Sequence, residues 1–355
     1  MPIDDNPIKG RGSSLQVPNR FLRRAYGVVH AEGVDEVEQE AYPTRFIATE
    51  AKSILNKITS PDLSFPWTLN AYQGCEHGCS YCYARPTHEY WGYSAGLDFE
   101  RVVLVKRNAP ELLEKALRHP RWKGEPISMS GVTDPYQPRE RVEQLTHRLL
   151  AIALEYKQPV TLITKNALIL RDLDLLKALA EQRLVQVAIS FTTMNEPLRR
   201  VLEPRTSSGA ERLRTMERLA LAKVPVMAMI APIIPALNEP EIPDLLERAA
   251  NAGALGASYT VLRTNGAVQP IFEAWLQHHF PDRAEKIMAQ TRALHGGKPN
   301  DSVHGRRMRG AGAFAENISR LFRVLRKRHF VDRCMPPLDS SAFKPPARGQ
   351  LDLFQ

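Results

Sequence analysis

The chain has 355 residues, of which 43% are hydrophobic and 25% are charged, the composition of a globular protein that can bury a core. No stretch is apolar enough to span a bilayer, and the N-terminus lacks the hydrophobic run of a secretory signal, so we expect a cytoplasmic protein with no membrane contact. The net charge of +9 comes mostly from residues 298–348, which hold twelve Lys and Arg against four Asp and Glu. This excess favours a surface that binds nucleic acid, although a solvated basic helix and tail would give the same count.

From Trp67 onward, short β-rich runs alternate with longer stretches of helical periodicity. We expect strands at 68–72, 127–130, 160–164, 185–191, 226–231 and 257–262. The helices between them are expected at 109–119, 140–157, 172–182, 208–223 and 240–252. Strands that alternate with helices form right-handed βαβ units around a parallel sheet, so the fold class is α/β. The periodicity leaves open whether the sheet curves into a partial barrel or is doubly wound, but the chain lacks the glycine-rich phosphate loops of the doubly wound type.

After about residue 270 the pattern becomes helical, with helices expected at 271–280, 282–295 and 311–329. The last of these has one apolar stripe, and its basic residues lie mostly off that stripe (Ile318, Leu321, Phe322 and Leu325; Arg320, Arg323, Lys327 and Arg328). We therefore divide the chain into an N-terminal basic and acidic arm (1–64), a core (65–265), a helical basic extension (266–334) and a flexible tail (335–355).

The four cysteines of the chain do not form a disulfide framework, because three lie within eight residues and Cys334 is far away. Cys75, Cys79 and Cys82 have the spacing Cys-x3-Cys-x2-Cys, which suits one small polynuclear centre. A tetrahedral zinc site would need His77 or Cys334 as a fourth ligand. A [4Fe–4S] cluster held by three cysteines instead leaves one iron free to bind a substrate or cofactor.

This cysteine motif, placed after the first strand of a six-fold βα chain, resembles that of the radical S-adenosylmethionine (SAM) superfamily. The resemblance covers residues 65–265 and implies a partial (β/α)6 TIM-like barrel with the cluster at its top. It also implies S-adenosyl-L-methionine as cofactor and an electron donor such as flavodoxin or ferredoxin. In such enzymes one electron cleaves SAM to methionine and a 5′-deoxyadenosyl radical, which abstracts a hydrogen atom from substrate. The cofactor carries the difficult chemistry, and the protein orients and shields it.

Three further segments resemble the spore photoproduct lyase-like, DNA repair photolyase-related branch. They are Tyr81-Cys82-Tyr83, the Ser-Gly-Val-Thr-Asp-Pro-Tyr-Gln-Pro sequence at 130–138, and Thr-Lys-Asn at 164–166. The resemblance implies that a short set of polar residues at strand ends contacts SAM: Ser130, Thr133, Asp134, Lys165 and Ser190. Among them, Lys165 is expected to pair with the SAM carboxylate and Ser190 to meet the ribose.

One departure from that branch concerns the hydrogen-atom donor. The lyase has a cysteine near the end of the second strand, whereas residues 128–132 of this chain are Ser-Met-Ser-Gly-Val. Tyr81 and Tyr83 are therefore the candidate catalytic hydrogen-atom relays, the alternative being that they pack around the cluster. The missing thiol argues against repair of the spore lesion itself and leaves the radical mechanism in place.

The two ends of the chain also carry signals for partners. Gln350, Leu351, Leu353 and Phe354 resemble the peptide by which bacterial DNA polymerases and repair proteins dock on the β sliding clamp, unless these residues fold back onto the body. Near the N-terminus, residues 20–24 combine Arg with Phe, which suits phosphate contact and base stacking or a simple packed arm.

The sequence thus predicts a radical SAM enzyme that acts on nucleic acid, with DNA repair as the expected process. A radical SAM enzyme that modifies RNA, a peptide or a small molecule is the first alternative. A non-enzymatic iron–sulfur or zinc module that binds DNA is the second.

Overall fold

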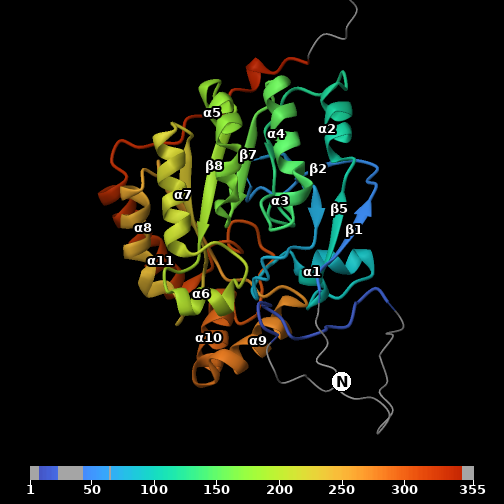
Figure 1. Ribbon diagram of the computed structural model, residues 1–355. Helices are drawn as coiled ribbons and strands as arrows, with labels where there is room; N and C mark the ends of the chain where they lie inside the picture. The colour runs from blue at the N-terminus through green and yellow to red at the C-terminus, as the bar shows by residue number, and fades with distance from the viewer. Residues whose placement is uncertain (1–7, 23–42, 64, 346–355) are drawn as a thin grey trace, which may run out of the picture.

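A seven-stranded sheet forms the centre of the computed structural model, which describes residues 8–22, 43–63 and 65–345 (Figure 1). The strand order is β10-β9-β8-β7-β6-β3-β2, and every neighbouring pair is parallel except β2 with β3. The strands are β2 (Leu55–Lys57), β3 (Trp67–Leu69), β6 (Ile127–Ser128), β7 (Val160–Thr164), β8 (Val185–Phe191), β9 (Val226–Ile233) and β10 (Ala257–Val261). The predicted parallel sheet is therefore confirmed. Within the described residues no pairing joins β10 to β2, so the sheet curves no further than an open, partial barrel.

The crossover helices lie along one side of this sheet (Figure 1). They are α2 (Ala109–Leu117), α4 (Leu145–Glu155), α5 (Leu173–Glu181), α7 (Gly209–Leu221) and α8 (Ile242–Asn251). Each helix buries one apolar face on the strands, as in α5, where Leu176 and Leu179 are fully buried. Because all six parallel strands run the same way, the loops that follow them gather at one end of the sheet.

A second, three-stranded sheet corrects the expectation of a single strand at 68–72. Its order is β1-β5-β4, with β1 (Arg45–Thr49), β5 (Val102–Lys106) and β4 (Tyr72–Gln73). The chain leaves β3 at Leu69, turns at Asn70 and enters the other sheet at Tyr72. Two hydrogen bonds hold this turn: the Val132 amide donates to Asn70 Oδ1 (3.0 Å), and Lys106 Nζ donates to the Asn70 carbonyl (3.0 Å).

The predicted helix 140–157 is also divided, into α3 (Glu140–Glu143) and α4, because Gln144 adopts a left-handed backbone (φ 51°). The buried Glu140 side chain accounts for the break. Its Oε1 accepts the Thr146 amide at the start of α4 (3.1 Å) and Arg171 Nη2 (2.8 Å). The remaining short elements are η1 (Arg85–Trp91), α1 (Asp98–Arg101), η2 (Ala167–Asp172), α6 (Glu196–Leu202), η3 (Glu239–Glu241) and η4 (Ser340–Ala342).

The helical extension contains α9 (Val268–His279), α10 (Pro281–Leu294) and α11 (Gly312–His329), close to the predicted ranges. The apolar stripe of α11 is buried except at Leu321, which is partly buried, and Phe322 packs on Tyr259 of β10 with ring centroids 4.3 Å apart. The basic side chains of α11 are exposed (Arg320, Arg323, Arg326, Lys327 and Arg328). Among the helices of the described residues, none has the length and apolarity that crossing a membrane requires.

After α11, residues 330–345 form a strap across the end of the sheet where the strands begin (Figure 1). Arg333 Nη1 donates to the Ala250 carbonyl (2.7 Å), before β10, and Gln186 Nε2 at the start of β8 donates to the Pro336 carbonyl (2.7 Å). The Lys344 amide donates to the Tyr156 carbonyl (3.1 Å), before β7. The predicted clamp-binding motif follows at residues 350–354 and lies outside the described residues.

Candidate active site

The cysteine loop follows β4 and lies at the end of the sheet where the parallel strands finish. Cys75 and Cys79 are buried, Cys82 is partly exposed, and all three are free thiols. The loop needs glycine at two positions with left-handed backbone, Gly74 (φ 81°) and Gly78 (φ 66°). A Cβ at Gly74 would lie 2.7 Å from the Val102 carbonyl oxygen, so the tight wrap of this loop depends on the missing side chain.

A fully buried ion pair anchors this loop through hydrogen bonds to the Cys79 carbonyl. Arg85 and Glu100 are both 0% exposed and form a salt bridge. Arg85 also donates from Nε and Nη2 to the Cys79 carbonyl (3.0 and 2.8 Å). The Cys75 amide donates to the Phe99 carbonyl (2.9 Å). Because removing one partner would leave a buried charge uncompensated, we expect that losing either residue would destabilise the loop.

The donor set of this loop fits an iron–sulfur cluster. In the described part of the chain, no three His, Cys, Asp or Glu side chains converge on one ion position. A cluster does not need such convergence, because each iron takes a separate thiolate. Burial, followed by the nearby Glu203, raises the pKa of the Cys79 thiol well above its ordinary value. Ionisation of that thiol therefore calls for added positive charge, which bound iron supplies.

Thr133 and Asp134 connect the cysteine loop to the end of β7. The Thr133 hydroxyl donates to the Gly74 carbonyl (2.9 Å). Asp134 accepts the Thr164 hydroxyl (2.7 Å), the Lys165 amide (2.9 Å) and the Tyr136 amide (2.8 Å), and it also lies 3.3 Å from His77 Nδ1. Burial opposes ionisation of this carboxyl, but His77 and these hydrogen bonds hold the pKa of Asp134 below its usual value. Two predicted site residues thus contact the cysteine loop, at Gly74 and at His77.

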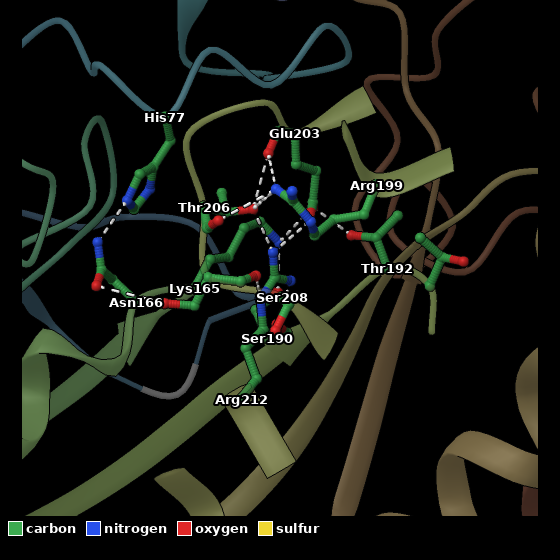
Figure 2. Close-up of polar contacts among 12 residues, drawn as sticks. His77, Lys165, Asn166, Ser190, Thr192, Arg199, Glu203, Thr206, Ser208 and Arg212 are labelled. Atoms are coloured by element: carbon green, nitrogen blue, oxygen red, sulfur yellow. Dashed lines mark hydrogen bonds and ion pairs between the residues drawn. The ribbon is translucent and has the colours of Figure 1, made fainter. Parts of the chain in front are cut away.

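Lys165 and Ser190 meet where β7, β8 and β9 end (Figure 2). The Lys165 ammonium donates to Ser190 Oγ (2.6 Å) and to the Ala231 carbonyl (3.3 Å). It also lies 3.3 Å from Glu203 Oε1, and its side chain is only 15% exposed. The sequence predicted Lys165 and Ser190 as separate contacts to SAM, and the structure brings them into direct contact with each other.

Glu203 is the centre of this network, and sequence reasoning did not single it out. The carboxylate is 0% exposed and accepts the Thr192 hydroxyl (2.6 Å), Arg212 Nη2 (2.5 Å) and the Tyr81 hydroxyl. Burial alone would raise the pKa of Glu203, but Arg212 and then Lys165 hold it far below its usual range, so the group is a carboxylate. Nothing local marks Glu203 in the sequence, because Tyr81 and Lys165 lie far from it along the chain.

The two predicted tyrosines occupy different environments. Tyr81 is 8% exposed, and its hydroxyl is held by Glu203 and lies 3.0 Å from Thr192 Oγ1. Tyr83 is 52% exposed, and its hydroxyl donates to the Gly131 carbonyl (2.8 Å), directly after Ser130. All the predicted site residues therefore lie near the cysteine loop or at the ends of β6, β7 and β8, and their roles stay predictions.

Comparisons with known proteins agree with this geometry. The family model of the radical SAM superfamily matches residues 69–249. An uncharacterized protein of Mycobacterium tuberculosis is 35% identical over 285 residues, which are 79% of this chain and 79% of that protein. An uncharacterized protein of Methanocaldococcus jannaschii is 30% identical over 195 residues, which are 55% of this chain and 70% of that protein.

Solved structures of spore photoproduct lyase share the fold. One mutant of that enzyme gives a TM-score of 0.58 at 16% identity, over 81% of this chain and 80% of that chain. Another mutant, with bound AdoMet and dinucleoside spore photoproduct, gives a TM-score of 0.56 at 16% identity. The family match takes in the cysteine loop and the ends of β7 and β8, where the polar residues gather. The chain therefore belongs to the radical SAM superfamily and is a radical SAM enzyme.

Proposed function

We propose that this radical SAM enzyme acts on nucleic acid and that damaged DNA is its substrate. The observation that carries the proposal is the cysteine loop surrounded by polar groups at the strand ends, in a fold shared with a lyase whose solved structures include a dinucleoside photoproduct. The exposed Arg and Lys residues of α11 and the net charge of +9 support a polyanionic substrate. The same proposal assigns the enzyme to the cytoplasm.

We assign cluster binding to Cys75, Cys79 and Cys82, with a [4Fe–4S] cluster as the group that three thiolates fit. When bound, this cluster supplies the electron that cleaves SAM to methionine and a 5′-deoxyadenosyl radical. The chain would hold SAM by the polar side chains at the strand ends: Ser130, Thr133, Asp134, Lys165 and Ser190. Lys165 supplies the cation for the SAM carboxylate, and Glu203 and Ser190 hold that cation in position.

We propose Tyr83 rather than Tyr81 as the hydrogen-atom donor to a substrate radical. Tyr83 is half-exposed, and its hydroxyl donates a hydrogen bond to the Gly131 carbonyl. Gly131 belongs to residues 128–132, the stretch in which the lyase has its cysteine. Tyr81 is buried, and its hydroxyl is held by Glu203. After the transfer, the tyrosyl radical would take an electron from the flavodoxin or ferredoxin that the reaction already requires and a proton from water.

The tail supplies a further proposal, docking on the β sliding clamp through residues 350–354. The strap supports it indirectly, because it carries residue 345 to the end of the sheet opposite the cysteine loop (Figure 1). A partner that held the tail from that end would leave the strand ends open to substrate.

The test is anaerobic reconstitution with iron and sulfide, followed by measurement of 5′-deoxyadenosine with SAM and a reductant. Protein alone, intact DNA, ultraviolet-damaged DNA and RNA are compared. The proposal predicts that damaged DNA raises the yield most, and Cys79→Ser is the inactive control. Stimulation by RNA alone would move the substrate class to RNA, and the absence of any SAM cleavage by the reconstituted protein would favour a non-enzymatic DNA-binding module.

A further inference from the structure

Residues 296–310, which we call the bridge segment, join the two edges of the open sheet. At the β10 edge, the Val261 amide donates to the Met308 carbonyl (3.0 Å), and Arg309 Nη2 donates to Ser258 Oγ (3.2 Å). At the other edge, in the connection between β2 and β3, Asp62 accepts Arg307 Nε and the Gly305 amide. The bridge segment therefore lies across the open side of the partial barrel, between its first and last strands.

Arginines of the bridge segment form salt bridges with the nearby carboxylates. Asp62 pairs with Arg307, and Asp301 pairs with Arg306. Arg263, in the loop that follows β10, is left without a carboxylate: in the part of the chain that the structure describes, its guanidinium makes no ion pair and no hydrogen bond. Burial, followed by the neighbouring Arg307, lowers the pKa of Arg263, and Asp62, which is paired with Arg307, offsets only part of this effect.

Arg263 lies beside the cysteine loop. Its Cζ is 5.7 Å from the centroid of the Tyr83 ring, and Tyr83 follows Cys82 directly. Asn265 Nδ2 donates to the Tyr83 carbonyl (3.4 Å), which ties the same loop to the cysteine loop. The Tyr83 ring is 52% exposed, so a flat group could contact it next to the guanidinium.

We propose that Arg263 binds a phosphodiester group of the substrate, on the open side of the barrel, while a neighbouring base contacts the Tyr83 ring. The inference rests on the proposed action on nucleic acid. A guanidinium presents a planar fork of donors that matches two phosphate oxygens, and the donors of Arg263 are not used by any hydrogen bond within the described residues. An exposed aromatic ring beside an Arg suits an unstacked base, which favours a nucleic-acid strand over an acidic peptide.

The test compares Arg263→Gln with wild-type reconstituted protein in binding to a labelled short oligothymidylate and to its uncharged methylphosphonate analogue. Arg218→Gln is the matched control, because Arg218 is an exposed residue of α7 on the outer helical layer. Loss of one charged phosphate contact should weaken binding of the charged oligonucleotide about tenfold. It should also reduce the slope of log affinity against log salt concentration by about the contribution of one phosphate contact. Arg263→Lys should restore part of the affinity, and iron content reports that each variant is loaded.

Wild-type protein that prefers the charged oligonucleotide, together with an affinity loss confined to Arg263→Gln, would support the site. Equal affinities of Arg263→Gln and wild type for that oligonucleotide would overturn it and leave action on nucleic acid standing. No binding of either oligonucleotide by wild type, or tighter binding of a polyglutamate peptide, would overturn the proposed substrate class as well.

Discussion

The ammonium of Lys165 lies 3.3 Å from Oε1 of Glu203, and the second oxygen of Glu203 accepts Arg212 Nη2 at 2.5 Å. One buried carboxylate is thus shared by two cations, so these three groups together carry a charge of about +1. This net positive charge is accessible at the strand ends through Lys165, because Lys165 is the partly exposed residue of the three. An anionic group that arrives there meets a cation already held in place, which lowers the entropic cost of binding.

Lys165→Ala should therefore weaken SAM binding about ten- to a hundredfold, because a charged hydrogen bond in a partly dry site contributes roughly 1.5–3 kcal/mol. Calorimetric titration of reconstituted protein with SAM measures the change. Lys177→Ala, at an exposed position on α5, is the control and should bind SAM as wild type does. An unchanged dissociation constant in Lys165→Ala protein with full iron content would place Lys165 outside the SAM site.

Glu203→Gln should destabilise the apo protein by about 3–5 kcal/mol, since it leaves the buried Arg212 and the partly exposed Lys165 without the carboxylate that they share. Because the folded pKa of Glu203 lies below its ordinary value, the stabilisation is complete near neutral pH and is lost as acid protonates the carboxylate. Urea unfolding at neutral and acidic pH measures both effects. Glu217→Gln, at an exposed position on α7, should change little. A loss below about 1 kcal/mol would show that the network relaxes around the missing charge.

The sequence predicted the parallel strands because each is a short, β-rich, buried run, as in β8, where five of seven residues are buried. It did not predict the change of sheet at Asn70. The run from Thr68 to Tyr72 reads as one apolar strand, and only contacts with Val132 and Lys106, far along the chain, divide it. Strand β5 was missed although Val102–Lys106 is almost entirely buried, because it pairs with β1 and β4 in a second sheet that the expectation of one parallel sheet did not include.

The candidate site shows the same limit. The cysteine loop was predictable because its residues are close in sequence, and the polar residues at strand ends came from the resemblance to the spore photoproduct lyase-like branch. Glu203 and Arg263 were not predictable, because their importance comes from partners brought together by folding. Tyr81 and Lys165 are distant from Glu203 along the chain, and Tyr83 is likewise distant from Arg263, which lies 5.7 Å from its ring.

Cys334→Ser should leave iron content and visible absorption unchanged, whereas Cys82→Ser should abolish both. Cys334 is exposed, in the strap that crosses the opposite end of the sheet, whereas Cys82 lies in the cysteine loop. Iron and sulfide assays after anaerobic reconstitution give the measurement. Loss of the cluster in Cys334→Ser protein would contradict the three-cysteine assignment.

Gly12→Ala should make the cluster more sensitive to air, because the N-terminal arm covers the cysteine loop at this residue. The Gly12 amide donates to Glu100 Oε2 (3.0 Å), and a Cβ on Gly12 would lie 1.6 Å from the Gly78 carbonyl oxygen. The arm or the loop must therefore move, which opens a path for oxygen to the thiolates.

Bleaching of the visible absorption in air, followed after reconstitution, measures this effect. Gly256→Ala is the matched control, because a Cβ there meets nothing within 4 Å. We expect several-fold faster bleaching in Gly12→Ala than in Gly256→Ala, with equal iron content at the start. Equal rates would show that the arm does not shield the cluster, since the substitution cannot be accommodated without displacing it from the cysteine loop.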